Sequence, residues 1–467
     1  MEKKFNSGDF ESPSFGGVGE AITATYYIET PFAPEKAAAI LAGEQSSGTF
    51  VAVPGETQEL KQRFAARLES VEFLETVNEP AIPGARSKDA RPDDPRLNDA
   101  VGQGVGQGKY HRAIVKVSWS IENFGYNLPV MVSTLQGNLY EISQFTGLKL
   151  MDIDLPASFG EHYTGPAFGV DGCRTLTGVN DRPLIGTIIK PSIGLTVQQT
   201  ADIVKTLAEA GIDFIKDDEL LSSSANSNFN DRVDAVMKVI NAHADKTGKK
   251  VMYAFNISGE VDEMLQRYEK IANSGGMCVM VSINSVGLSA TKKICDQRQL
   301  VIHAHRNGWG MLTRHPLLGI DFKAYQKLWR LAGVDQLHVN GIQNKFWESD
   351  DSVVASIEAC LSKMYDHKTV LPVVSSGQWG GQAFETWRRT KTVDLLYMAG
   401  GGIMAHPMGA AAGVTALQQA WKAAVDGLSL EDTAKMYPEF GKSVEKFGPL
   451  NPPKWDFRKP QSKKNNT

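Results

Sequence analysis

Cysteine is scarce in this chain, and its few positions form no metal-binding or redox motif. No two cysteines stand at the C-x-x-C spacing, and none has a histidine at C-x-x-H; the four are Cys173, Cys278, Cys295 and Cys360. A disulfide framework and a cysteine-bound zinc site are therefore not expected. Reduced thiols are typical of the cytosol, so the sequence predicts a cytoplasmic protein.

Long apolar runs and a broad basic surface are missing as well. No apolar stretch reaches the roughly 18 residues that a membrane helix needs, and the N-terminal MEKKFNSGDF lacks the apolar region of a secretory signal. The net charge is −4, and basic residues are dense only in the C-terminal tail. We therefore expect neither a membrane protein nor a nucleic-acid-binding protein, and small molecules and copies of the chain itself remain as partners.

The length and composition are sufficient for two domains. The chain has 467 residues, of which 42% are hydrophobic, and it can bury a large core. We expect an N-terminal α+β domain over residues 1–155, a barrel domain over 156–440 and a partly disordered tail over 441–467. The stretch from Glu79 to Lys109 is dense in Pro, Gly, Asp and Arg, which predicts a mobile loop.

The second part of the chain repeats one unit, a short apolar run followed by a helical stretch. In the first unit, Thr196 and Gln199 form a capping box, and Gly211 ends the predicted helix. Eight such repeats predict a (β/α)₈ TIM barrel, whose active site lies at the carboxyl ends of the strands. A doubly wound open sheet is the alternative, but no G-x-G-x-x-G follows the first run. The expected strands are 183–190, 214–218, 251–257, 278–283, 300–305, 336–341, 371–377 and 395–401.

The segment DFIKDDE contains the strongest chemical signal. Period-2 alternation places Lys216 and Asp218 on one face of the strand, and Glu219 follows in the loop. An ion-paired strand end would explain the cluster equally well without any function. The functional interpretation is an Mg²⁺ site, because Mg²⁺ prefers carboxylate oxygens. A lysine ammonium is a poor ligand for Mg²⁺, whereas the anionic carbamate that CO₂ forms with lysine would be a good one.

This lysine–x–Asp–Glu pattern resembles the signature of the RuBisCO superfamily, and further motifs of that family follow over residues 20–440. The motifs stand in the family's order, at strand ends or in the N-terminal half. They are GTIIKPSIGL with Lys190, IHAHR with His305 and Arg306, LHVNG with His338, Lys345 seven residues later, VVSSG with Ser375 and Gly377, AGGG with Gly400 and Gly401, and EQSSGTF with Glu44 and Thr49.

The resemblance implies a fold and a set of roles. The fold is a C-terminal (β/α)₈ barrel with an N-terminal α+β domain of the ferredoxin-like type. Lys216, as a carbamate, would bind Mg²⁺ together with Asp218 and Glu219. Catalysis would involve Lys216 with Lys190, His305 and Lys345. The substrate would be bound by Glu44, Thr49, Arg306, His338, Ser375, Gly377, Gly400 and Gly401. In the family, the first two reach the barrel of a partner subunit, so a homodimer with a shared site is expected.

Several positions depart from the carboxylases of this family. Ser192 replaces a second active-site lysine, Val130 stands where an asparagine is expected, Trp309 replaces a histidine and Phe50 replaces a tryptophan of the phosphate loop. These positions surround the reacting carbons, whereas the metal-binding residues are intact. Carboxylation of ribulose bisphosphate is therefore not expected, and the chain resembles RuBisCO-like proteins instead.

RuBisCO-like proteins act on phosphorylated keto compounds. Two predicted anion-binding groups, at opposite ends of the site, favour a substrate with a negative charge at each end. Arg306 and His338 could hold one anion, while the turn at Gly400 and Gly401 could present backbone N–H groups to a phosphate. A β-keto acid phosphate such as 3-oxo-isoapionate 4-phosphate fits this arrangement, with 3-phosphoglycerate and glycolate as implied products. The alternatives are an enolase or isomerase of methylthiopentulose phosphates and a non-catalytic binding protein.

Overall fold

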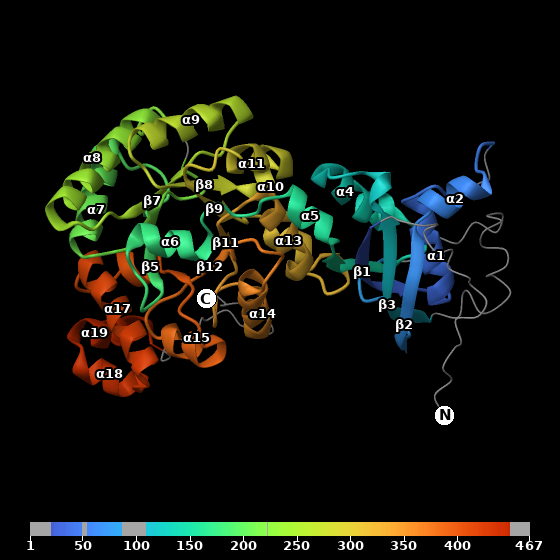
Figure 1. Ribbon diagram of the computed structural model, residues 1–467. Helices are drawn as coiled ribbons and strands as arrows, with labels where there is room; N and C mark the ends of the chain where they lie inside the picture. Colours follow the sequence, from blue (N-terminus) through green and yellow to red (C-terminus); the bar gives the residue numbers. More distant parts are fainter. Residues whose placement is uncertain (1–19, 49–53, 86–108, 222, 449–467) are drawn as a thin grey trace, which may run out of the picture.

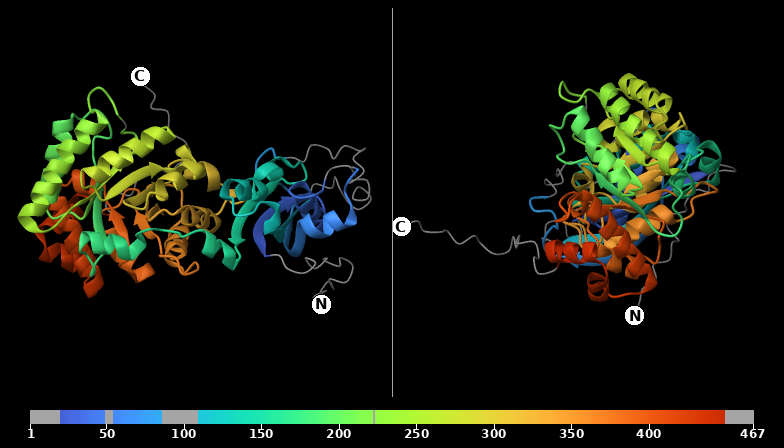
Figure 2. Two further views of the ribbon diagram at one scale, coloured as in Figure 1. Left: turned by 45° about the horizontal axis from the view of Figure 1, so that its top comes forward. Right: turned by 90° about the vertical axis from the view of Figure 1, so that its left-hand side faces the viewer.

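The computed structural model describes residues 20–48, 54–85, 109–221 and 223–448, which form an N-terminal sheet lobe and a barrel lobe side by side (Figures 1 and 2). Thr49 and Phe50 lie outside the described residues, as do most of the expected loop and the end of the tail. Within the described part of the chain, no helix is long and apolar enough to cross a bilayer.

The N-terminal lobe is a five-stranded sheet in the order β10-β4-β1-β3-β2. Strand β1 shows why it forms, since Ile22, Ala24, Tyr26 and Ile28 alternate with more exposed residues and are all buried. The strands from this half are β1 (Ala21–Thr30), β2 (Arg67–Val77), β3 (Tyr110–Ser120) and β4 (Gly147–Asp154). The α-helices among the described residues of this half are α1 (Pro34–Glu44), α2 (Gln58–Phe64) and α4 (Leu128–Leu135), and two 3₁₀ helices span Ile121–Asn123 and Gly137–Glu141.

The fifth strand of this sheet comes from the barrel half of the sequence. Strand β10 (Leu318–Ile320) pairs in parallel with β4, and Tyr140 donates a 2.6 Å hydrogen bond to the carbonyl of Gly319. Lys149 on β4 donates to the carbonyls of Thr313 and His315, at 2.9 and 3.2 Å. A strand from the barrel half of the sequence therefore completes the sheet of the N-terminal lobe, while the barrel closes as a separate sheet.

The eight predicted barrel strands are confirmed, and they close in the order β11-β12-β13-β5-β6-β7-β8-β9 with parallel pairing. Each is shorter than the apolar run that predicts it, because residues at one or both ends of the run lie outside the strand. The strands are β5 (Leu184–Ile188), β6 (Phe214–Lys216), β7 (Met252–Asn256), β8 (Cys278–Ser282), β9 (Val301–His305), β11 (Gln336–His338), β12 (Leu371–Val374) and β13 (Leu396–Met398).

Helices surround this barrel in Figure 1, and the first of them, α7 (Val197–Glu209), follows the predicted capping box. Both reciprocal bonds between Thr196 and Gln199 are present, and Gly211 adopts a positive φ just beyond the helix. Helix α19 extends past the domain boundary expected at residue 440. The other helices after β4 are α5 (Ala157–His162), α6 (Gly169–Thr177), α8 (Phe229–Thr247), α9 (Val261–Asn273), α10 (Ile283–Val286), α11 (Leu288–Cys295), α12 (Trp309–Thr313), α13 (Phe322–Ala332), α14 (Asp350–Leu361), α15 (Gln382–Thr390), α16 (Gly401–Met404), α17 (Ala410–Asp426), α18 (Leu430–Met436) and α19 (Pro438–Phe447).

Candidate active site

Lys216 ends strand β6 and is buried at the mouth of the barrel. Its Nζ donates to the carbonyl of Asp217 at 2.9 Å and lies 3.3 Å from Glu219 Oε2 and 3.5 Å from Met280 Sδ. Burial lowers the pKa of Lys216, although the charges of Glu219 and Asp218 act in the opposite direction. The lysine therefore loses its proton more readily than an exposed one.

Asp218 is held by the lysine of the neighbouring strand. Lys190, just beyond β5, donates to Asp218 Oδ2 at 2.6 Å and to Ser192 Oγ at 2.8 Å. This is possible because Ile188 at the end of β5 pairs with Lys216 at the end of β6. Burial alone would raise the pKa of Asp218, but the hydrogen bonds from Lys190 and the Leu220 backbone, together with the charges of Lys190 and Lys216, lower it overall.

Asp217, between Lys216 and Asp218 in the sequence, contacts residues of β7 and Arg232 instead of Lys190. It accepts hydrogen bonds from Tyr253 Oη at 2.5 Å and from the backbone N–H of Asn256 at 3.0 Å, and Arg232 lies 3.4 Å away. The predicted alternation is therefore present. Asp217 connects β6 to β7, whereas Lys216 and Asp218 contact Glu219 and Lys190 instead. Asn256, which sequence reasoning missed, donates to the carbonyls of Glu219 and Leu221 and fixes the loop after β6.

Three histidines from β9 and β11 lie together; His303 and His338 are buried, and His305 is partly exposed. His303 Nε2 lies 2.9 Å from His338 Nε2, and the rings of His305 and His338 are 4.4 Å apart. Burial lowers the pKa of all three, so they are neutral near pH 7. His305 Nε2 lies 3.5 Å from Glu219 Oε2, which places this ring beside the acidic cluster.

His338 does not offer a free nitrogen to a ligand in this arrangement. Its Nε2 contacts His303, and its Nδ1 lies 3.1 Å from Ser375 Oγ. His303 in turn contacts Gln336 at 2.7 Å. His338 and Ser375 therefore bond to each other in this structure, and their binding of the substrate stays a prediction.

Arg306 differs most from the sequence expectation of a free anion clamp. Its guanidinium is buried, and Nη2 donates to Glu348 Oε2 at 3.1 Å. The rings of Trp309 and Phe322 lie 5.1 and 5.0 Å from the guanidinium carbon. Nη1 has no hydrogen-bond partner among the described residues. Nη1 is therefore left unpaired and shielded from solvent, while Glu348, a residue that sequence reasoning missed, accepts from Nη2.

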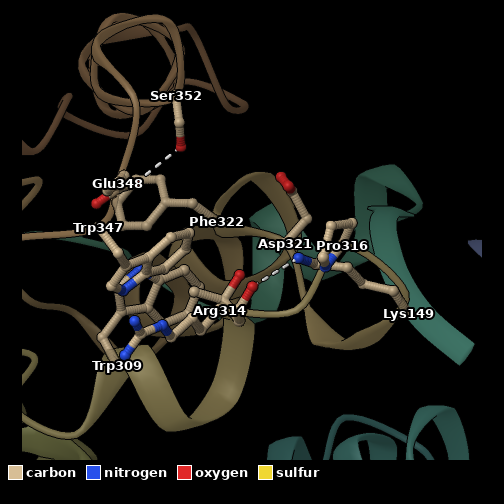
Figure 3. A pocket seen from close by; sticks show the side chains of 10 residues that line it. Lys149, Trp309, Arg314, Pro316, Asp321, Phe322, Trp347, Glu348 and Ser352 are labelled. Atoms are coloured by element: carbon tan, nitrogen blue, oxygen red, sulfur yellow. Dashed lines mark hydrogen bonds between the residues drawn. The ribbon is translucent and has the colours of Figure 1, made fainter. Parts of the chain in front are cut away.

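A cavity of about 130 Å³ is lined by Glu348 but not by Arg306 (Figure 3). Figure 3 shows the indoles of Trp309 and Trp347 on one side, Glu348 beside them, and Lys149 and Asp321 opposite. The remaining lining residues are Thr313, Arg314, Pro316, Phe322 and Ser352. The cavity therefore lies where the barrel loops meet the N-terminal sheet.

The loops after β12 and β13 contain the predicted glycines. Gly377 has a φ of +85°, and an added Cβ would lie 3.3 Å from Lys345 Cβ, so the close approach of the two loops requires glycine there. Lys345 is exposed, and its backbone N–H donates to the carbonyl of Ser376 at 3.1 Å. Gly400 and Gly401 begin helix α16, where the first N–H groups have no partner within the helix.

Glu44, from the N-terminal half, is not part of this cluster. It is exposed at the end of α1, which lies in the sheet lobe away from the barrel (Figure 1). Its expected neighbour in the site, Thr49, lies outside the described residues.

Comparison with known families agrees with this architecture. Residues 169–447 match the family described as "Ribulose bisphosphate carboxylase large chain, catalytic domain", and residues 99–159 match its N-terminal domain. The chain is 49% identical to the 3-oxo-isoapionate-4-phosphate transcarboxylase/hydrolase of Xanthobacter autotrophicus, over 90% of this chain and 98% of the relative. It is 48% identical to the 3-oxo-isoapionate-4-phosphate decarboxylase of Rhizobium etli, over 91% and 98%.

Two solved structures are similar over nearly the whole chain. A rubisco-like protein from Burkholderia fungorum is 41% identical with a TM-score of 0.82, and the match covers 91% of this chain and 100% of that one. The octameric ribulose-1,5-bisphosphate carboxylase/oxygenase from Pyrococcus horikoshii OT3 is 32% identical with a TM-score of 0.79, over 92% and 93%. This chain therefore belongs to the RuBisCO large-chain family, and it is an enzyme of the RuBisCO-like type.

Proposed function

We propose that the chain acts on 3-oxo-isoapionate 4-phosphate, a β-keto acid with a phosphate at its other end. The observation that carries this proposal is the near-complete match, at 49 and 48% identity, to two relatives that bear this substrate in their names. The unpaired Nη1 of Arg306 and the backbone N–H groups at the Gly400 turn could each donate to an anion. We infer that the carboxylate meets Arg306 and the phosphate meets the turn.

The residues at the end of β6 fit an Mg²⁺ site only if Lys216 is carbamylated. The described residues contain no group of three or more His, Cys, Asp or Glu side chains that could hold a metal. Asp218 and Glu219 supply two carboxylates, and a carbamate on Lys216 would supply the third anionic ligand. The burial of this amine favours the neutral form, which is the form that reacts with CO₂. Bound Mg²⁺ would polarise the keto oxygen of the substrate as a Lewis acid.

The surrounding side chains would then carry out the proton transfers. Lys190 lies beside Asp218, so its ammonium can donate a proton to the carbanionic carbon that C–C cleavage leaves. His305 is neutral and near Glu219, which suits a general base. Lys345, exposed on its loop, would close over the phosphate.

We propose further that two subunits share each site. Glu44 lies at the end of α1 and would reach the barrel of the partner subunit together with Thr49, as isologous two-fold symmetry allows. The octameric assembly of the Pyrococcus carboxylase/oxygenase supports an assembly of even number.

The two relatives are named for different reactions, a transcarboxylation with hydrolysis and a decarboxylation. Analysis of the products distinguishes these two reactions. A transcarboxylase/hydrolase should convert the substrate into 3-phosphoglycerate and glycolate, which is the outcome we expect. A decarboxylase should instead release CO₂ and leave a shorter keto-sugar phosphate. ³¹P NMR of the reaction mixture, together with trapping of CO₂, separates the two. Absence of both product sets with the purified, Mg²⁺- and bicarbonate-treated enzyme would exclude this substrate.

One observation favours a second candidate. Glu348 already neutralises Arg306, and the adjoining cavity contains Trp309, Trp347 and Phe322. An apolar methylthio group would suit such a cavity, so an enolase or isomerase of methylthiopentulose phosphates is the alternative. ³¹P NMR of a reaction mixture that contains a methylthiopentulose phosphate tests this alternative.

A further inference from the structure

We propose that Glu348 limits the second anion subsite to one negative charge, so that it accepts a carboxylate and rejects a second phosphate. The inference deepens the proposed function and rests on it, because it assumes that the substrate meets Arg306. Glu348 would thereby be a specificity-determining residue of this site.

Glu348 is fixed in place from several sides. The side chains of Arg306 and Glu348 are only 4% and 2% exposed, and their ion pair measures 3.1 Å. Ser352 Oγ donates to Glu348 Oε1 at 2.8 Å, and Asn340 donates to Oε2. A buried carboxylate with three donors does not leave its arginine readily, because an unpaired buried charge is costly.

The guanidinium is enclosed in its other directions as well. Trp309 and Phe322 lie against it, and Nη2 is used by Glu348. Nη1 is buried and lacks a partner among the described residues. A buried N–H without an acceptor is unfavourable, so this edge points to a ligand group that accepts from it.

The charge of that ligand group follows from the electrostatics. The pair of Arg306 and Glu348 is neutral overall, and the substrate approaches a dipole instead of a full positive charge. A carboxylate carries one charge and can accept from the single free edge. A phosphate carries close to two charges at pH 7, must be desolvated more strongly and is repelled by Glu348. Rejection through a fixed like charge is a common route to specificity.

Binding of two probes to the Mg²⁺- and bicarbonate-treated protein tests the inference by isothermal titration calorimetry. 3-Phosphoglycerate carries one phosphate and one carboxylate, and ribulose 1,5-bisphosphate carries two phosphates. Wild type should bind the bisphosphate no more tightly than 3-phosphoglycerate. Glu348→Gln keeps the shape and removes the charge; its oxygen can still accept from Asn340, while its NH₂ group can donate to the hydroxyl of Ser352. It should tighten the bisphosphate by about tenfold or more and change 3-phosphoglycerate by less than about threefold.

The matched control is Ser352→Ala, which removes a contact to Glu348 without changing any charge. It should leave both affinities within about threefold of wild type. The inference fails if Glu348→Gln leaves the ratio of the two affinities unchanged, or if Ser352→Ala changes it equally. If Glu348→Gln does not fold, the wild-type protein still provides a test. Tighter binding of ribulose 1,5-bisphosphate than of 3-phosphoglycerate by the wild type would overturn the inference. If wild type binds 3-phosphoglycerate and Arg306→Ala leaves that affinity unchanged, the proposed substrate orientation is itself wrong.

Discussion

Lys190 Nζ donates a 2.6 Å hydrogen bond to Asp218 Oδ2, across two neighbouring barrel strands. Two lysines and two carboxylates therefore meet at this point, since Lys216 also lies 3.3 Å from Glu219. With both lysines protonated, the cluster has little attraction for a cation. Converting Lys216 to a carbamate replaces a positive charge with a negative one, so metal affinity here should depend on CO₂.

Bicarbonate should therefore activate the wild-type enzyme, and Lys216→Ala should abolish its Mg²⁺-dependent activity. The physical reason is that Asp218 and Glu219 alone are too few ligands for a tight site. ¹³C NMR with labelled bicarbonate should reveal a carbamate signal that Lys216→Ala lacks. Lys246→Ala, at an exposed position on α8, is the control and should retain both signal and activity. Full Mg²⁺-dependent activity without bicarbonate would contradict the carbamate.

The enzyme should not fix CO₂ on ribulose 1,5-bisphosphate. Ser192 accepts from Lys190 where the carboxylases have a second lysine, and Trp309 is packed against Arg306. Val130 is exposed on α4 and offers no polar group. Incubation with labelled CO₂ and this sugar should give no labelled 3-phosphoglycerate above background. Sustained incorporation in proportion to enzyme concentration would refute the prediction.

Mixing two inactive homodimers, Glu44→Gln and Lys216→Ala, should restore partial activity after subunit exchange. Each mixed dimer would contain one intact site, so a 1:1 mixture should recover about a quarter of the wild-type activity. Lys216→Ala mixed with Asp218→Ala is the control, because both changes lie in the barrel and no intact site can form. Activity of a monomer at nanomolar concentration would rule out a shared site.

Arg306→Ala should lower kcat/KM by at least about thirtyfold, since a desolvated charged contact contributes about 2–5 kcal/mol. Arg306→Lys should recover only part of this, because an ammonium cannot reproduce the planar fork. Removing the guanidinium leaves Glu348 buried without its partner, so the melting temperature should fall as well. The double variant Arg306→Ala/Glu348→Gln should regain stability but not kcat/KM. An equal loss for a substrate analogue without the carboxylate would show that Arg306 is purely structural.

Asp335 should make the stability of the fold depend on pH. Burial raises the pKa of Asp335 to about 6, although backbone N–H groups of Ile302, Gly169 and Phe168 donate to it. A raised pKa means that the stabilising contribution is complete below the unfolded value near 4 and is lost as the pH rises through about 6.

Chemical denaturation at a series of pH values measures this effect. Relative to Asp335→Asn, which cannot titrate, the free energy of unfolding of the wild type should fall by about 3 kcal/mol between pH 4 and pH 6. A difference between the two proteins that does not vary with pH would contradict the raised pKa.

The sequence by itself determined the repeating framework and the acidic cluster. Eight apolar runs predicted eight strands because burial on both faces demands such runs, and all eight close into the barrel. The capping box at Thr196 was readable because its two partners stand three residues apart. Lys216, Asp218 and Glu219 were found for the same reason, since a strand places alternate residues on one face.

Only the tertiary structure decided which distant side chains meet. His303 contacts His338 from 35 residues away, and Arg306 pairs with Glu348 from 42 residues away. Local periodicity in the sequence predicts neither of these two pairs. Closure of the barrel and the path of each loop determine which strand ends become neighbours. Whether an arginine is a free anion clamp or a neutralised one depends on that geometry, since a charge is matched by whatever lies within a few ångströms of it.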